Sequence, residues 1–279
     1  MNTLHSRNFS SVKSLTFLVV LIISASMVGA FFYDLFKSEV RNSVVSDKYS
    51  QCNVLGISIY GSLMTYAPSI NEDRDQEYVE SYTSSDDVVW SINNTDRNDN
   101  IRAIIIEVDS AGGEPVAAEE VANAIKRANK PVIAYIRQSG TSGAYWAISS
   151  ADRIFASKNS DIGSIGVTAS YVVNADENKK FIQLSSGKYK DIGHPYKLLT
   201  NEEKALAMRD VKITHQNFIE EVAKNRGLTI EEVTKISDGS SMMGDAAKSF
   251  GLIDEIGGYY EADQYVGTLI GDWVNVCWE

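Results

Sequence analysis

The chain has 279 residues, of which 44% are hydrophobic and 23% charged, and its formal net charge is −11. This balance is typical of a globular protein with one large or two modest domains. The excess of acidic groups argues against a nucleic-acid-binding protein, because phosphates require a basic protein surface.

The first predicted element is a membrane-spanning helix over residues 14–33, which contain no charged side chain. Their number is close to the ~20 residues that a helix needs to cross a bilayer core. Arg7 and Lys13 precede this stretch, so we expect residues 1–13 to stay in the cytoplasm and the rest of the chain to lie outside it. A cleaved signal peptide is the alternative, because "SMVGA" offers small residues at plausible cleavage positions.

Residues 34–52 are polar and of mixed charge, which predicts a tether to a folded domain over residues 53–279. In the first half of this domain, expected strands and helices alternate. The strands lie in "NVLGISIYGSL", "IRAIIIEVDS", "KPVIAYIRQ" and "DRIFAS", and the helices in "EYVESYTSSDDVVWSINN", "PVAAEEVANAIKRA" and "SGAYWAISSA". This alternation predicts βαβ units in a layered α/β fold with a largely parallel sheet, whose apolar central strands are buried on both faces.

The second half of the domain begins with strand-like pieces and polar turns, and then becomes helical. A long helix is predicted in "TNEEKALAMRDVKITHQNFIEEVAKNRG", because Thr200 and Glu203 fit a capping box and Gly227 fits a terminator. Two shorter helices are expected in "TIEEVTKIS" and "DAAKSFG", and "LIDEIGG" is expected to close the domain.

Cys52 and Cys277 lie at opposite ends of this domain and lack the close spacing of a metal knuckle or a redox pair. They could pair if the fold joins the chain ends in an oxidising compartment, and otherwise they are two free thiols. The sequence contains no cluster of His, Cys and acidic residues at metal-ligand spacing, so we expect no metal and no cofactor.

Two glycine-bearing turns, "DSAGGEP" and "SGTSGAYW", each follow an expected strand and precede an expected helix. Loops after parallel strands lie at one edge of the sheet, where α/β proteins usually place their sites. Glycine allows close backbone approach, and the free N–H groups of a helix start attract negative charge. Taken singly, however, the glycines are also explained by tight turns and the serine by helix capping.

Together, the motifs between residues 53 and 258 resemble the signal peptide peptidase family, which are membrane-anchored serine proteases of the Ser/Lys type. The matching stretches include "EVDSAGGEPVAAEEVANAI", "KPVIAYIRQSGTSGAYWAISSADRIFAS", "DIGSIGV", "SGKYKDIGHPYKLLTNEEK" and "DGSSMMG". The chain looks more distantly like the Clp-protease and crotonase superfamily, which implies a layered fold of repeated ββα and βαβ units. It departs from the family at Ala111, where proline is common, and in Thr141-Ser142-Gly143-Ala144, where the motif usually begins Ala-Ser-Gly-Gly.

The resemblance implies a role for several residues of this chain. Ser142 corresponds to the nucleophile, Lys190 to the general base, and Ser164 to a serine that hydrogen-bonds the lysine. The backbone N–H groups of Gly113 and Gly143 correspond to the oxyanion hole. A lysine can act as a base only when it is neutral, so we expect Lys190 in a largely apolar cleft.

Tyr145 and Val167 are candidates for the apolar wall that binds substrate, whereas Trp146 is expected to pack in the core. The resemblance implies cleavage of hydrophobic peptides, notably signal peptides, by residues 53–279 acting as the protease domain. It also implies a homo-oligomeric ring in which neighbouring subunits share active sites.

Other mechanisms and functions remain open. His194 is the one serious histidine rival to Lys190 as the base, and His215 is expected on the surface of the long helix or in a packed polar contact. A crotonase-like acyl-CoA enzyme would use the same oxyanion N–H groups, although coenzyme A is cytoplasmic. A catalytically silent, membrane-anchored interaction module is a third alternative.

Overall fold

The computed structural model describes residues 52–66, 81–173 and 183–279. The predicted cytoplasmic tail and anchor, and the tether up to residue 51, lie outside the described residues. Within the described ranges, no helix has both the length and the apolar composition that crossing a membrane requires. Residues Cys52–Glu279 form one compact unit.

The described residues contain a nine-stranded sheet with the main strand order β2-β1-β3-β4-β5-β8. These strands are β1 (Val54–Met64), β2 (Tyr82–Ser84), β3 (Ala103–Gly113), β4 (Val132–Thr141), β5 (Arg153–Ala156) and β8 (Glu255–Ile256). Three short strands complete the sheet: β6 (Asp161–Gly163) beside the end of β4, β7 (Ser241–Met243) beside β6, and β9 (Val276–Trp278) beside β1. All pairs are parallel except β6 with β7, as the alternating pattern predicts for the central strands.

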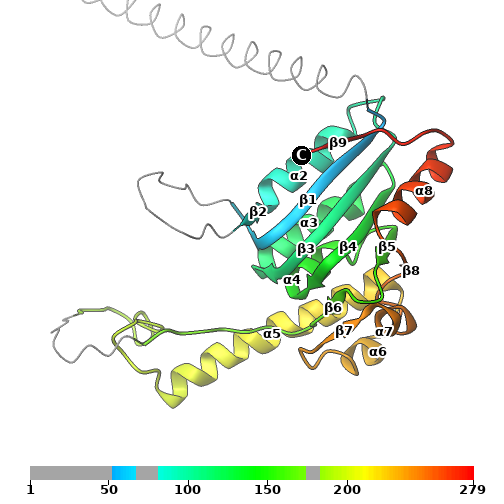
Figure 1. The fold of residues 1–279 in the computed structure, drawn as a ribbon. Coiled ribbons are helices and arrows are strands. Elements are labelled where there is room, and N and C mark those ends of the chain that lie inside the picture. Colours follow the sequence, from blue (N-terminus) through cyan, green and yellow to red (C-terminus); the bar gives the residue numbers. More distant parts are fainter. Residues whose placement is uncertain (1–51, 67–80, 174–182) are drawn as a thin grey trace, which may run out of the picture. The chain divides into compact units, whose positions relative to one another are not determined.

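Helices cover both faces of the sheet (Figure 1). One face carries α2 (Ser85–Thr95), α3 (Pro115–Arg127) and α4 (Ser142–Ile148), and the other carries α8 (Tyr259–Ile270). Successive residues of β3 point to opposite faces, so Ile105 packs with Val266 of α8 while Ile104 and Ile106 face the opposite way. All three isoleucines are fully buried, which confirms that this apolar run is a strand buried on both faces.

The helix expected in "EYVESYTSSDDVVWSINN" starts later than the pattern indicates. Residues 82–84 instead form β2, which pairs with the end of β1. Ser84 then caps α2, because its hydroxyl accepts a hydrogen bond from the backbone N–H of Asp87. Two further elements, α8 and β9, follow the segment that was expected to close the domain, and they extend the fold to the end of the chain.

The long helix α5 (Asn201–Arg226) begins and ends as predicted, with the Thr200–Glu203 capping box and a left-handed Gly227. It is followed by α6 (Ile230–Thr234) and α7 (Gly244–Ser249). None of the α5 residues between Glu203 and Phe218 is buried, so packing holds this helix mainly by its C-terminal half. Figure 1 shows its N-terminal half running past the sheet.

The two cysteines form a disulfide, which settles the alternative that the sequence left open. Strand β9 lies beside the start of β1, with Leu55 opposite Cys277, so the two Cα atoms of the disulfide are 5.8 Å apart. The bond therefore ties the start of the first strand to the last strand, across 225 residues of sequence.

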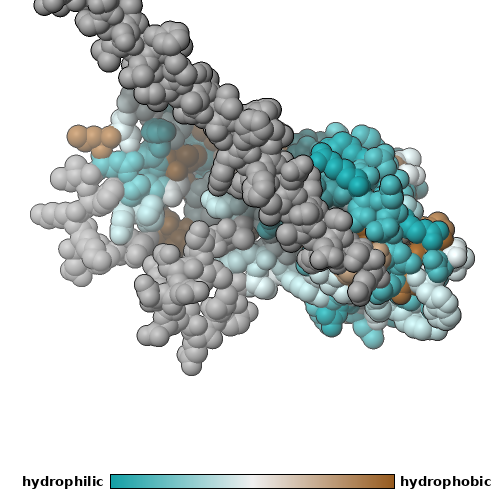
Figure 2. All heavy atoms as spheres, turned by 90° about the horizontal axis from the view of Figure 1, so that it is seen from above, coloured by the Kyte–Doolittle hydropathy of each residue, from teal (hydrophilic) through white to brown (hydrophobic). Residues whose placement is uncertain are grey.

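The face of the molecule shown in Figure 2 is mostly hydrophilic where described residues are visible, with scattered hydrophobic side chains. Isolated exposed apolar residues are normal on a globular protein.

Candidate active site

Ser142 is the first residue of α4 and directly follows β4. Its φ is +52°, a left-handed conformation that is uncommon for residues other than glycine. Among the described residues, Ser164 is the one other non-glycine residue with positive φ, at +49°. Strain of this kind costs on the order of 1–3 kcal/mol and gathers at functional sites, so both serines are candidates for chemistry.

The two glycine-bearing turns pack directly against each other. A Cβ atom added to Gly113 would lie 1.9 Å from the Leu63 carbonyl oxygen, and one added to Gly112 would lie 2.8 Å from the Cβ of Ser142. A Cβ on Gly143 would lie 3.2 Å from the Gly113 nitrogen. Only glycine therefore fits at the first two positions, and the predicted oxyanion-hole residues are brought together beside Ser142.

The backbone N–H of Gly143 lies in the first turn of α4, where no acceptor exists within the helix. The Gly113 nitrogen lies next to this first turn of α4. Ser142, Gly113 and Gly143 therefore lie close together in the structure, and their catalytic roles stay a prediction.

These residues open onto a pocket of about 470 Å³. It is lined by Gly113, Pro115, Ser142, Gly143, Trp146, Ser164, Gly166, Val167, Thr168, His215, Phe218, Ser237, Asp238 and Gly239. Val167, which the sequence analysis names as a candidate for substrate binding, lies in this wall. Trp146 stacks on Phe218 with ring centroids 4.8 Å apart, so it both packs and lines the pocket.

Tyr145 does not line the pocket. Its side chain is fully buried, and its hydroxyl donates a hydrogen bond to the Leu252 carbonyl at 2.8 Å. Burial raises the pKa of the Tyr145 hydroxyl well above its usual value. Consecutive residues of a helix point about 100° apart, so one of this aromatic pair faces the pocket and the other faces the core. The structure gives the wall position to Trp146.

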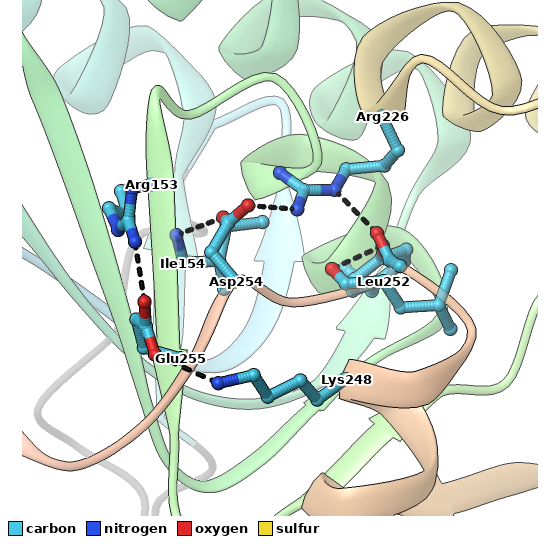
Figure 3. Close-up of polar contacts among 9 residues, drawn as sticks. Arg153, Ile154, Arg226, Lys248, Leu252, Asp254 and Glu255 are labelled. Carbon is cyan, nitrogen blue, oxygen red and sulfur yellow. Dashed lines mark hydrogen bonds and ion pairs between the residues drawn. The ribbon is translucent and has the colours of Figure 1, made fainter.

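The core contact of Tyr145 belongs to a polar network that fixes the C-terminal end of α5 (Figure 3). Arg226 donates to the Gly251 carbonyl at 3.1 Å and to Asp254 at 2.8 Å. Asp254 also accepts from the backbone N–H of Ile154 in β5 at 2.8 Å. The C-terminal half of α5, which carries His215 and Phe218 of the pocket wall, is therefore held to β5 and to the loop at residues 251–254.

Lys190 lies elsewhere in the same chain. It sits in a series of turns rather than a strand, its side chain is exposed, and it is not part of the pocket wall. The preceding residues Lys188 and Tyr189 both donate to Glu202 in the first turn of α5. From Glu202 to Phe218 in the pocket wall, α5 advances about 24 Å at ~1.5 Å per residue. Within one chain, Lys190 and Ser142 are not brought together.

Ser164 lines the pocket, but its hydroxyl donates to the Gly239 carbonyl at 2.9 Å instead of contacting a lysine. His194 lies in the turns near Lys190 and is not part of the wall.

The pocket wall also contains residues that the sequence patterns do not assign to the site, namely His215, Phe218 and residues 237–239. One sequence feature could have indicated that His215 and Phe218 line the same surface. They are three residues apart, which places both on one face of a helix.

The fold is similar to that of a ClpP1 mutant from Listeria monocytogenes, with a TM-score of 0.50 at 15% sequence identity. The similarity covers 78% of this chain and 98% of the ClpP1 chain. The protein therefore has a mixed α/β fold of the Clp-protease type.

The model of peptidase family S49 matches residues 124–269, more than half of the chain, and the chain belongs to this family. A putative protease of Methanocaldococcus jannaschii is 36% identical over 172 residues, which cover 60% of this chain and 55% of the relative. A putative signal peptide peptidase SppA of Enterococcus faecium is 24% identical over 227 residues, covering 79% and 64%. A chloroplastic serine protease SPPA of Arabidopsis thaliana is 31% identical over 168 residues, covering 58% and 25%. The chain thus spans less than two thirds of the length of each of these relatives.

Proposed function

We propose that this S49 family member is a serine endopeptidase in which Ser142 attacks the peptide carbonyl. The observation that carries the proposal is the strained Ser142 in the wall of a pocket, beside Gly112 and Gly113, neither of which can take a side chain without a clash. A serine hydroxyl becomes a useful nucleophile when a neighbouring base removes its proton.

Lys190 of a second copy of the chain is the proposed base. The pocket described above contains no lysine, and Lys190 of the same chain lies near the far end of α5. The exposed half of α5 and the segment before it carry large apolar side chains that no other described element covers. Leu198 is 77% exposed, Met208 52% and Ile213 54%, which suits a contact between copies. Such a contact would also remove water around the lysine and favour its neutral form.

The proposed reaction has two steps. Ser142 Oγ bonds to the substrate carbonyl carbon while its proton passes to Lys190 Nζ. The N–H groups of Gly113 and Gly143 hold the oxyanion, and each such donor is typically worth ~10²–10³ in rate. Lys190 then protonates the leaving amine as the C–N bond breaks. In the second step, Lys190 takes a proton from water as the water oxygen bonds to the acyl carbon. Lys190 then returns this proton to Ser142 Oγ as the ester C–O bond breaks, which releases the carboxylic acid and restores both groups.

Hydrophobic peptides are the proposed substrates, and signal peptides are the specific candidate, since one relative is described as a putative signal peptide peptidase. Pro115, Val167 and the stacked Trp146 and Phe218 supply an apolar wall for such chains. Membrane anchoring by residues 14–33, with the protease domain outside the cytoplasm, remains part of this proposal. The Cys52–Cys277 disulfide supports it, because such bonds persist mainly in oxidising compartments.

The proposal is tested by incubating the full-length protein, in detergent, with apolar peptides. We expect Ser142→Ala and Lys190→Ala each to lower kcat/KM by at least about 10³-fold, as removal of a member of a catalytic unit does. His194→Ala should retain activity near the wild-type level. Loss of activity in His194→Ala together with retention in Lys190→Ala would move the base assignment to the histidine.

A further inference from the structure

The pocket that contains Ser142 has a negative charge in its wall. Among the described residues that line it, Asp238 carries the one carboxylate, and none is a lysine or an arginine. Asp238 is exposed, and within the described part of the chain it makes hydrogen bonds to Ser240 but no ion pair. Asp245, the next carboxylate along the chain, is paired with Lys158 at 3.7 Å. The charge of Asp238 is therefore left without a described cation to balance it.

Hydrogen bonds from Ser240 hold this carboxylate in its ionised form. Asp238 Oδ1 accepts from the Ser240 hydroxyl at 2.6 Å and from the Ser240 backbone N–H at 2.9 Å. The bond from the hydroxyl, followed by that from the backbone, lowers the pKa of the Asp238 carboxyl, so the group is charged at neutral pH. Neither of these bonds uses Oδ2, which leaves this oxygen open to a further donor.

The turn at residues 238–240 is attached to the segment that lines the pocket after β6. The Ser164 hydroxyl donates to the Gly239 carbonyl at 2.9 Å, and its backbone N–H donates to the next carbonyl of the chain at 3.1 Å. A Cβ atom added to Gly166 would lie 2.9 Å from the Gly239 Cα, so the two glycines are in direct contact. Gly166 and Val167 both line the pocket, so the charged turn adjoins an apolar part of the wall.

A lysine or arginine side chain matches both parts of this wall. It has an apolar stem that packs on apolar surface and a cationic end that pairs with a carboxylate. Val167 offers the apolar surface, and Asp238 offers the carboxylate. A cleft with walls of low dielectric also concentrates the field of a single charge, so the same carboxylate repels an acidic side chain.

We propose that Asp238 selects peptides that carry a lysine or an arginine close to the bond that is cut. The inference rests on the proposed peptidase activity and narrows its substrate class. Signal peptides meet this requirement, because their basic residues precede an apolar core. Because Asp238 is exposed, we expect a preference of about three- to fivefold, which is what a solvent-exposed ion pair provides.

The test uses two pairs of peptides that differ mainly in charge at one position close to the scissile bond. The first pair has lysine or norleucine there, and the second has glutamate or glutamine. At low ionic strength, the full-length wild-type protein should favour lysine over norleucine by about three- to fivefold in kcat/KM, and glutamine over glutamate by a similar factor. Both preferences should shrink in 1 M salt, where the Debye length is about 3 Å.

Asp238→Asn removes the charge and keeps the turn, because the asparagine side-chain oxygen can accept the same two hydrogen bonds from Ser240. This variant should lose both preferences and cleave the norleucine and glutamine peptides at the wild-type rate. Asp245→Asn is the matched control, because it removes one negative charge from an exposed residue of α7 that is not part of the pocket wall. It should keep both preferences.

The inference is overturned, and the proposed peptidase activity is not, if wild type cleaves the lysine and norleucine peptides equally well or if Asp238→Asn keeps the preference. It is also overturned if Asp238→Asn shifts the pH–rate profile for the norleucine peptide, since the carboxylate would then act on the proposed base Lys190. Loss of cleavage of every peptide in Asp238→Asn would overturn it as well, because the residue would then serve the folding of the site. A wild-type protein that cleaves none of the peptides would contradict the proposed function itself, and the inference with it.

Discussion

At Ser142 the backbone takes a conformation that suits glycine better than serine. The neighbouring glycines explain how this is tolerated, because Gly112 leaves room for the Ser142 side chain and Gly113 fits against the Leu63 carbonyl. The serine is thus held in a strained turn although glycine would be more stable there. A backbone conformation that lowers the stability of the fold is commonly retained at residues that act in catalysis, the role proposed for Ser142.

Replacing this serine should therefore have opposite effects on stability and activity. We expect Ser142→Gly to abolish peptide cleavage and to raise the free energy of unfolding by about 1 kcal/mol, because glycine adopts positive φ without strain. Ser142→Ala should abolish cleavage without this gain, since alanine keeps a Cβ atom. Denaturant unfolding of the two variants measures the difference, and equal stability would contradict the strain argument.

At the scale of elements, α5 has two differently held halves. Its C-terminal half packs on α4 and is fixed by Arg226. Its N-terminal end is held by polar contacts: Glu203 closes the capping box with Thr200 and accepts from Lys197 at 2.7 Å. Two hydrogen bonds lower the pKa of the Glu203 carboxyl to about 2. The bond from Lys197 has the larger effect, and the bond from the Thr200 backbone N–H has the smaller one. These contacts fix the segment that carries Lys190.

This lowered pKa makes the start of α5 sensitive to acid. The unfolded chain has a glutamate pKa of about 4.3, so the stabilisation by Glu203 is complete above that pH and is lost as the pH falls toward 2. We expect Glu203→Gln to be less stable than wild type at pH 6, with the difference shrinking by pH 3. Lys197→Met, which removes the main cause of the shift, should show the same trend. Thermal unfolding across this pH range measures it, and a difference that is constant with pH would contradict the assignment.

Sequence patterns predict some of these elements well and others poorly, for physical reasons. The run Ile104–Ile106 identifies β3 because burial on both faces needs consecutive apolar residues. The capping box and Gly227 identify the ends of α5 because those signals are local. The three-residue strands β2, β6 and β7 depend on register with distant strands, which no local signal encodes.

The candidate site, like the fold, was predictable from the sequence only where local signals determine the position of a residue. The glycines and Ser142 belong to local turns, and the structure brings them together as expected. The choice between Tyr145 and Trp146 depends on how α4 is rotated about its axis, which the sequence does not fix. In the proposed mechanism, the position of Lys190 relative to Ser142 depends on a second copy of the chain, so neither the sequence nor the fold of one chain provides it.

At the scale of the whole molecule, the sheet places both glycine turns at one edge, and a disulfide joins the first and last strands. That bond closes a loop of about 225 residues in the unfolded chain. It therefore restricts the unfolded ensemble and stabilises the fold without contacting the pocket.

Removal of this bond should lower stability more than activity. We expect the double variant Cys52→Ser, Cys277→Ser to lose about 2–5 kcal/mol of unfolding free energy while still cleaving peptides below its melting temperature. Urea unfolding of wild type with and without reductant provides the matched comparison. Identical unfolding curves would show that the bond does not constrain the chain in solution.

The central claim is that Ser142 of one copy works with Lys190 of another, and mixing two inactive variants tests it most directly. Ser142→Ala and Lys190→Ala are purified separately, then dissociated and reassembled together in equal amounts. The mixture should regain cleavage, because random assembly in a head-to-tail contact gives about a quarter of the sites both groups. A mixture that forms mixed oligomers and remains as inactive as either variant alone would contradict the claim.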